Sequence, residues 1–170
     1  MNLFGIIWRQ QSYTFEIKSY TNALDGYIIL NDKSAADSLL SICQSLVKKH
    51  PNGEAYLFSS YLSYTINFGS PKEIKELLTE YKDIELTNDD AMNIAQGYSK
   101  IGEYDKAMNI LAGISPAAFT MNSLKYASVK FNILDEQGKY KEALHSYKEF
   151  SAMLERYQSE LIFQKTPMIF

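Results

Sequence analysis

Apolar side chains recur at intervals of three and four residues in two long segments. In residues 34–50 this apolar stripe comprises Ala36, Leu39, Leu40, Cys43, Leu46 and Val47. In residues 139–161 it comprises Tyr140, Ala143, Leu144, Tyr147, Phe150, Leu154, Tyr157 and Leu161. Such spacing places the apolar residues on one face of a helix. Strict alternation of apolar and polar residues, as in a half-buried strand, does not occur at useful length, so we predict an all-α fold.

Helix start and stop signals separate these segments. Ser70-Pro71-Lys72-Glu73 predicts a helix start, because the serine can cap the helix, the proline fits its first position and the glutamate can reach back to the cap amide. Thr87 to Asp90 is a weaker version of the same signal. His50-Pro51-Asn52-Gly53 predicts a helix end, since proline cannot continue the helical hydrogen bonds and Asn-Gly tolerates positive φ.

One short motif repeats along the chain. The segment from Gly102 to Ala107 (GEYDKA) recurs from Gly138 to Ala143 (GKYKEA), 36 residues later. Glycine allows the chain to reverse tightly between two helices, the tyrosine ring covers the turn, and alanine allows the second helix to approach closely. We therefore expect repeated helix–turn–helix units, each of which needs its neighbour to complete its core.

Weaker copies of the motif precede these two. One begins at Gly69, 33 residues before Gly102, and has Ile74 where the motif has alanine. Another begins at Asn31, 38 residues before Gly69, and lacks the turn glycine. The intervals bracket the period of about 34 residues that is typical of tetratricopeptide repeats.

On these residues the chain resembles the tetratricopeptide repeat (TPR) family. The copy from Asn88 to Ile114 carries the resemblance best, with packing positions filled by Ala91, Ile94, Ala95, Tyr98, Gly102, Tyr104, Ala107 and Leu111. The last copy departs from the family pattern at Lys130, which replaces an apolar residue. The resemblance implies a TPR-like α-α superhelix, or solenoid, of about three to four helix hairpins with a long C-terminal helix.

The resemblance also implies a domain organisation. We expect a single repeat domain over residues 1–170, with repeats at 17–50, 55–86, 88–119 and 121–154 and a helical extension at 155–170. More loosely, the acidic, Tyr-rich repeats that run into a long final helix resemble the repeat segment of bacterial membrane-bound signalling regulators.

The function that these resemblances imply is a non-catalytic scaffold that binds a protein or peptide. The looser one implies the sensory or interaction segment of a larger bacterial regulator. The alternative is structural self-association without a peptide groove, in which the long last helix and the aromatic run Leu3–Trp8 form a homodimer. Otherwise we expect Leu3–Trp8 to fold over the first helix pair as a cap.

Charge and hydropathy exclude some partners. The net charge is −3 and the basic residues are dispersed, with Lys48-Lys49 the only adjacent pair. Nucleic-acid binding depends on clustered Lys and Arg side chains, so we expect no nucleic-acid partner. No stretch approaches the roughly 20 apolar residues that span a bilayer, and Leu3–Trp8 lacks the features of a signal peptide. The compartment stays open: cytoplasmic, or periplasmic if the chain belongs to a membrane-bound regulator.

Few residues could carry catalysis or bind a metal. His50 and His145 lie far apart in the sequence, and we expect both to be structural or solvated. Cys43 falls on an apolar stripe, where cysteine usually acts as a small buried hydrophobe. Nucleophile elbows, phosphate loops and metalloprotease motifs are absent. We expect no catalytic residue, no metal and no cofactor.

The candidate binding surface follows from the repeat. In stacked hairpins the first helices line the concave side, so their non-packing residues face a groove. Counting along these helices predicts a partner-binding set of Tyr56, Ser59, Ser63, Asn67, Asp89, Met92, Gln96, Ser99, Lys100, Lys125, Ser128, Asn132 and Asp135. Tyr56 and Met92 are the expected anchors of this groove. The competing interpretation is that these positions are simply solvated.

Overall fold

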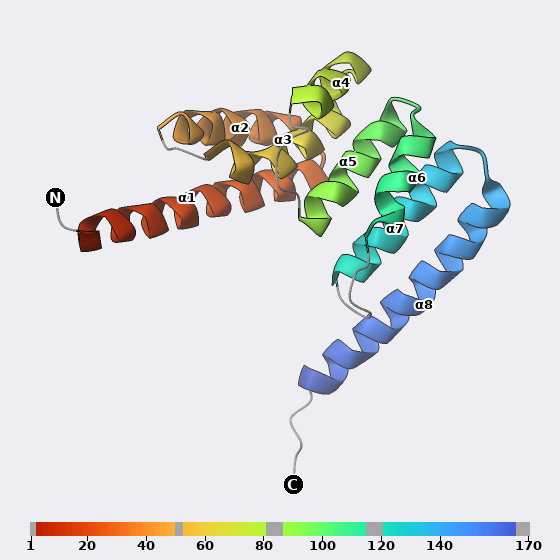
Figure 1. The fold of residues 1–170 in the computed structure, drawn as a ribbon. Helices are drawn as coiled ribbons and strands as arrows, with labels where there is room; N and C mark the ends of the chain where they lie inside the picture. The colour runs from red at the N-terminus through yellow and green to blue at the C-terminus, as the bar shows by residue number, and fades with distance from the viewer. Residues whose placement is uncertain (1–2, 50–52, 81–86, 115–120, 166–170) are drawn as a thin grey trace, which may run out of the picture. The chain divides into compact units, whose positions relative to one another are not determined.

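The protein consists of α-helices. The computed structural model describes residues 3–49, 53–80, 87–114 and 121–165, and the side chains of 13–49, 55–80, 87–114 and 123–159. Figure 1 shows the helices of these residues, which are α1 Leu3–Ile29, α2 Lys33–Val47, α3 Gly53–Phe68, α4 Pro71–Glu80, α5 Asn88–Lys100, α6 Tyr104–Ala112, α7 Met121–Glu136 and α8 Tyr140–Lys165. No strand occurs in the described ranges, so the all-α prediction is confirmed.

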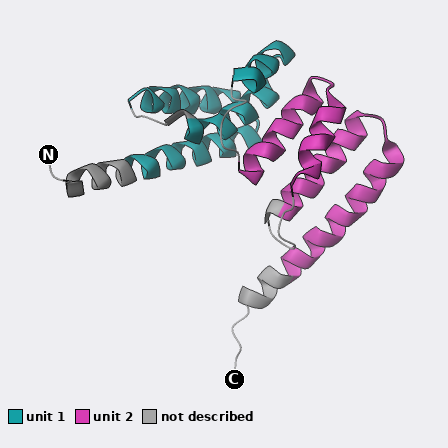
Figure 2. Cartoon of the chain, viewed as in Figure 1, with its two compact units in different colours: residues 1–85 teal, residues 86–170 magenta. Residues whose placement is uncertain are grey.

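The chain divides into two compact units, residues 1–85 with α1–α4 and residues 86–170 with α5–α8 (Figure 2). In unit 1, α1 packs on α2 and α3, α2 also packs on α3, and α3 packs on α4. In unit 2, α5 packs on α6 and α7, α6 also packs on α7, and α7 packs on α8. Within each unit, the first helix of the later pair therefore contacts both helices of the earlier pair. The single domain over 1–170 stays a prediction.

Three of the turns inside the helix pairs share one geometry. Asn31, Gly102 and Gly138 have φ values of 56°, 80° and 76°. At each turn this residue donates its amide to the carbonyl three residues back, and the next residue donates to the carbonyl five residues before it, with N···O distances of 2.9–3.0 Å. This is the Schellman arrangement that ends many helices. Asn31 thus replaces glycine in the first hairpin, because asparagine tolerates the left-handed region better than most residues.

Gly69 serves the second hairpin differently. Its φ is not positive, but a Cβ atom there would lie 2.7 Å from the Thr65 carbonyl oxygen. The next helix begins with the predicted cap: the Ser70 amide donates to Glu73 Oε2 at 2.7 Å, and the Glu73 amide donates to Ser70 Oγ at 3.3 Å. The Thr87–Asp90 box forms in the same way. Both predicted helix starts are confirmed, whereas His50-Pro51-Asn52 lies outside the described residues.

Each unit has its own hydrophobic cluster. The cluster of unit 1 joins α1, α2 and α3 and contains Leu24, Ile28, Ala36, Leu40, Cys43 and Leu57. The cluster of unit 2 joins α5, α6 and α7 with the residue that follows α6 by two positions, and contains Met92, Ala95, Ala107, Leu111, Ile114, Val129 and Ile133. Both clusters draw on three consecutive helices, so no hairpin in them has a core of its own.

The predictions for the two ends of the chain have different outcomes. The predicted long final helix is present: α8 runs through the expected extension to Lys165, and residues 166–170 lie outside the described part. The expectation that Leu3–Trp8 folds back as a cap is wrong for the backbone, which continues as the first turns of α1. No proline separates this run from the rest of the helix, so nothing in the local sequence interrupts the helical hydrogen bonds.

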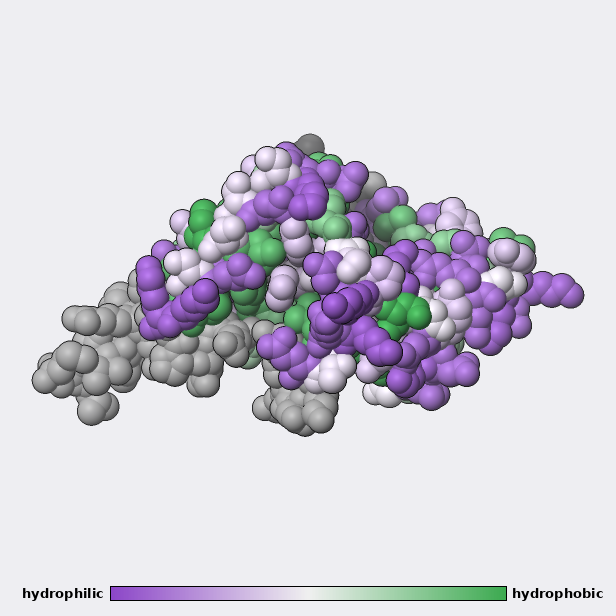
Figure 3. Space-filling model, turned by 90° about the horizontal axis from the view of Figure 1, so that it is seen from above, coloured by the Kyte–Doolittle hydropathy of each residue, from purple (hydrophilic) through white to green (hydrophobic). Residues whose placement is uncertain are grey.

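The molecular face in Figure 3 is mainly hydrophilic, and hydrophobic residues appear on it as scattered small patches. Isolated apolar residues are ordinary on a protein surface. None of the helices in the described residues combines the length and the hydrophobicity that crossing a bilayer requires.

The turn geometry yields a stability prediction. Gly138→Ala should lower the free energy of unfolding by about 1–2 kcal/mol, because a Cβ atom is disfavoured in the left-handed region that φ 76° requires. Gly113→Ala, in the same unit at φ −79°, should change it by no more than about 0.5 kcal/mol. Urea unfolding followed by circular dichroism measures both. Equal effects of the two substitutions would contradict the role assigned to the turn.

Candidate functional site

The predicted binding residues of unit 2 form a polar strip along α5 and α7. We call this set the α5–α7 strip; its exposed or half-buried members are Asp89, Gln96, Lys100, Lys125, Ser128, Asn132 and Asp135. They recur along each helix at intervals of three, four or seven residues, which places them on one side of the helix. The two helices pack against each other directly, so the strip combines side chains of both.

Two ion pairs join the strip across the helices. Lys125 Nζ lies 3.0 Å from Asp89 Oδ1, near the start of both helices. Lys100 Nζ lies 2.6 Å from Glu136 Oε1, near the end of both. Like ends therefore meet, and α5 and α7 run parallel. Each pair spans 36 residues, which is also the interval between the turn glycines.

Two predicted members of the groove are buried instead. Met92, expected to be an anchor, is 0% exposed and belongs to the unit 2 core. Ser99 is 4% exposed, and its hydroxyl donates to Glu136 Oε2 at 2.6 Å. The prediction that these two side chains face a groove is wrong. Because α5 packs on both α6 and α7, the covered arc of its surface is wider than one apolar stripe indicates.

Both lysines of the strip are paired with carboxylates of α5 or α7. Glu136, which the sequence prediction omitted, accepts from both Lys100 and Ser99. Burial alone would raise the pKa of the Glu136 carboxyl, but these two hydrogen bonds and the Lys100 charge lower it below its usual range. The two lysines are held by carboxylates of the same surface, so they are not displayed as a clamp for a ligand carboxylate. Gln96, Ser128 and Asn132 offer neutral hydrogen-bonding groups between the two ion pairs.

The predicted residues of unit 1 lie on α3. Tyr56 and Asn67 are exposed, whereas Ser59 and Ser63 are half-buried. The Lys18 ammonium of α1 lies 5.7 Å from the centre of the Tyr56 ring, a cation–π distance. The amide of Asn67 donates to the Ser63 carbonyl of its own helix at 2.8 Å. Tyr56 is thus an accessible aromatic surface that already contacts a cation of its own chain.

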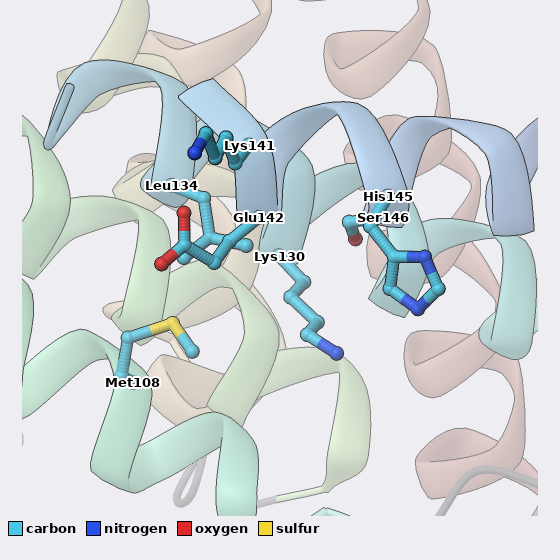
Figure 4. A pocket seen from close by; sticks show the side chains of 7 residues that line it. All are labelled: Met108, Lys130, Leu134, Lys141, Glu142, His145 and Ser146. Carbon is cyan, nitrogen blue, oxygen red and sulfur yellow. The ribbon is translucent and has the colours of Figure 1, made fainter. Parts of the chain in front are cut away.

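Sequence reasoning missed a pocket on unit 2. A pocket of about 470 Å³ lies among α6, α7 and α8, and its lining comprises Met108, Lys130, Leu134, Lys141, Glu142, His145 and Ser146. In Figure 4 the Glu142 carboxylate lies toward Met108, and Lys130 and His145 extend on the other side. The sequence carried one signal for it: Lys130 stands where the repeat pattern has an apolar residue, and a lysine there indicates an incompletely closed gap between helices.

The lining of this pocket mixes charges with apolar groups. His145 Nε2 lies 3.5 Å from Glu149, a pair that is ionic only when the imidazole is protonated. The Ser146 hydroxyl is buried and has no hydrogen-bond partner in the described part of the chain. The lining therefore combines apolar side chains with charged groups of both signs, and within the described residues the Ser146 hydroxyl is not hydrogen-bonded to a base.

Cys43 is buried in unit 1, as the sequence predicted. Burial, and to a smaller extent the charge of Asp25, raises the pKa of its thiol to about 11. A thiol with that pKa is almost entirely protonated near neutral pH and is a poor nucleophile. His145 is exposed, whereas His50 lies outside the described residues. No group of three or more His, Cys, Asp or Glu side chains suited to a metal ion occurs among the residues described.

Comparison with known proteins adds no family to this description. The chain matches no protein-family model, no curated protein and no solved structure. The class that the structure itself defines is an all-α protein built from successive helix pairs.

The ionised Glu136 carboxyl should stabilise unit 2. Its folded pKa lies below the unfolded value of about 4.3, so its contribution is present above that pH and disappears as the pH falls through the folded pKa. We expect the destabilisation caused by Glu136→Gln to be measurable at pH 6 and to shrink toward pH 3. An NMR titration should place the Glu136 pKa below about 4.3 and show it rising in Lys100→Met. A wild-type pKa above that value would mean that burial outweighs the hydrogen bonds.

Proposed function

We propose that this chain is a TPR-like, non-catalytic scaffold that binds a protein or an extended peptide along its first helices. The observation that carries the proposal is the parallel packing of α5 and α7, which brings accessible polar side chains of both helices onto one strip. In stacked hairpins the first helices line the binding side, so this strip is the expected contact surface.

The repeated register supports the TPR-like part of the proposal. The turns at Asn31, Gly102 and Gly138 share a hydrogen-bond pattern. Each α5–α7 ion pair joins two residues that are 36 positions apart, which is also the interval between the last two turns. A repeated local geometry with contacts between neighbours is the organisation of helical-repeat proteins. The fit of α7 against both α5 and α6 agrees with it.

The chemistry of the strip supports a peptide-like partner. Gln96, Ser128 and Asn132 carry neutral groups that suit backbone amides and carbonyls, and the flanking ion pairs hold the lysines in place. The proposal does not rest on a basic cluster that would bind phosphate. It does not rest on a catalytic triad of nucleophile, base and orienting group either. A narrower form, a sensory or interaction segment of a larger bacterial regulator, is supported by the sequence resemblance alone.

A matched pair of substitutions tests the strip. A random peptide library displayed on phage is panned against the immobilised full chain, and the affinity of the enriched peptides is measured by calorimetry. Asn132→Arg should weaken binding by about tenfold or more, because it removes an amide and adds bulk and charge on the strip. Asn109→Arg, at an exposed position on α6, should leave the affinity unchanged.

Two outcomes would contradict the proposal. If no peptide is enriched over a bare surface, the strip is not a peptide site. If enriched peptides bind both variants as tightly as the wild type, they bind elsewhere and the strip is a solvated surface. Circular dichroism of both variants confirms that the helices are intact.

A further inference from the structure

In both units, the second helix of the earlier pair contacts the first helix of the later pair through the same three positions. In unit 2 these positions are Tyr104, Met108 and Leu111 on α6, which pack toward α7. The Tyr104 hydroxyl donates to the Glu136 carbonyl oxygen at 3.1 Å, in the last turn of α7, where carbonyls lack helical partners. Leu111 is 1% exposed and lies in the cluster that contains Ile133.

Unit 1 repeats this junction with other side chains. The equivalent positions on α2, counted from the turn residue, are Lys33, Asp37 and Leu40. The Lys33 ammonium donates to the hydroxyl of Tyr64 on α3 at 3.1 Å, and that hydroxyl also donates to Asp37. Leu40 packs in the unit 1 cluster, beside which Tyr64 lies. Tyr64 stands at the position of Ile133 in α7, so the two junctions agree in register.

On α8 no following helix lies against the same three positions in the described structure. They are Tyr140, Leu144 and Tyr147, each 36 residues beyond its counterpart on α6. Their exposed fractions are 71%, 54% and 49%. The Tyr147 ring contacts Phe131 of α7, with the ring centres 5.5 Å apart, and still leaves half of its surface open. We call this row the α8 face; it has the register of a junction surface, and no described helix covers it.

A complementary row is exposed on α1. The positions by which α7 meets the preceding pair include Val129, Ile133 and Glu136. Their equivalents on α1, counted from the turn, are Asn22, Gly26 and Ile29.

The side chains of this α1 row are accessible. Asn22 is exposed and Ile29 is 83% exposed. Phe15 lies on the same side of the helix and is 76% exposed. We call Phe15, Asn22, Gly26 and Ile29 the α1 face.

We propose that copies of this chain associate head to tail, the α8 face of one molecule docking on the α1 face of the next in the register of the α6–α7 junction. The sizes fit: the large Tyr147 replaces Leu111 on one side, and Gly26 replaces Ile133 on the other. A Cβ atom added at Gly26 would meet nothing within 4 Å, so the space above this residue is open and no side chain there opposes the ring. The Tyr140 hydroxyl is placed to donate to the Ile29 carbonyl, as Tyr104 donates to Glu136.

This pairing favours a second copy in head-to-tail order over a symmetric dimer. Two α8 faces would oppose tyrosine to tyrosine without a small residue to receive either ring. The α1 face supplies that small residue together with two exposed apolar side chains, Phe15 and Ile29. Because the two surfaces differ, the interface is heterologous and can add further copies at both ends. The α5–α7 strip takes no part, so this inference is independent of the proposed function.

Blocking each face separately tests the proposal by sedimentation velocity over a wide concentration range. Leu144→Lys blocks the α8 face and Gly26→Lys blocks the α1 face; both positions are open, so neither substitution disturbs a core. The wild type should associate progressively, and each variant alone should be monomeric, its dissociation constant raised at least about tenfold. An equimolar mixture should form one-to-one dimers that do not grow, because one intact face of each kind remains. Asn109→Lys should associate like the wild type.

Three results would overturn the proposal. The first is a wild-type chain that is monomeric throughout the concentration range. The second is a closed dimer that survives Gly26→Lys but not Leu144→Lys, which would indicate pairing of two α8 faces. The third is association that neither substitution weakens. None of them bears on peptide binding by the strip, which is measured separately.

Discussion

The structure of unit 2 depends on the burial of one aliphatic row of α7 against the pair that precedes it. Val129 and Ile133 are almost fully buried, and the cluster that buries them consists of residues from α5, from α6 and from the segment after α6. A helix pair cannot provide such a cluster alone, because each helix covers only part of its neighbour's apolar surface. The order of helices along the chain therefore becomes an order of contacts, each pair supporting the next.

This constraint determines which surfaces remain for function. The packing of α5 on α6 and α7 buries Met92 and Ser99 and leaves Asp89, Gln96 and Lys100 accessible on the strip. The ion pairs near both ends show that α5 and α7 run parallel. The same constraint leaves the α8 face and the α1 face uncovered in the described structure. The proposed binding strip and the proposed head-to-tail interface are thus two consequences of one packing rule.

Local signals in the sequence were sufficient to predict two capped helix starts and two glycine turns. Gly102 and Gly138 indicated the reversals because few other residues adopt positive φ, and Ser70 with Glu73 indicated a cap because its hydrogen bonds are local. The buried face of α5 was harder to predict, because periodicity shows which side of a helix faces the core but not how many helices pack on that side. Met92 was therefore assigned to the groove, although packing on both α6 and α7 buries it completely.

Features that depend on the gaps between helices were even harder to predict from the sequence. The pocket beside Lys130 depends on the spacing of α6 and α8 across α7, which no local pattern encodes, although the lysine on a packing position was a signal. The ion pairs of the strip could be anticipated only in part, since Lys100 was predicted without its partner Glu136.

The central claim, that α7 packs on the preceding pair in repeat register, is tested most directly by nuclear Overhauser contacts in a methyl-labelled sample. The account predicts contacts between the methyl groups of Leu111 and those of Val129 or Ile133, which share one buried cluster. A spectrum in which Leu111 has contacts with other methyl groups but none with α7 would contradict the stacked arrangement.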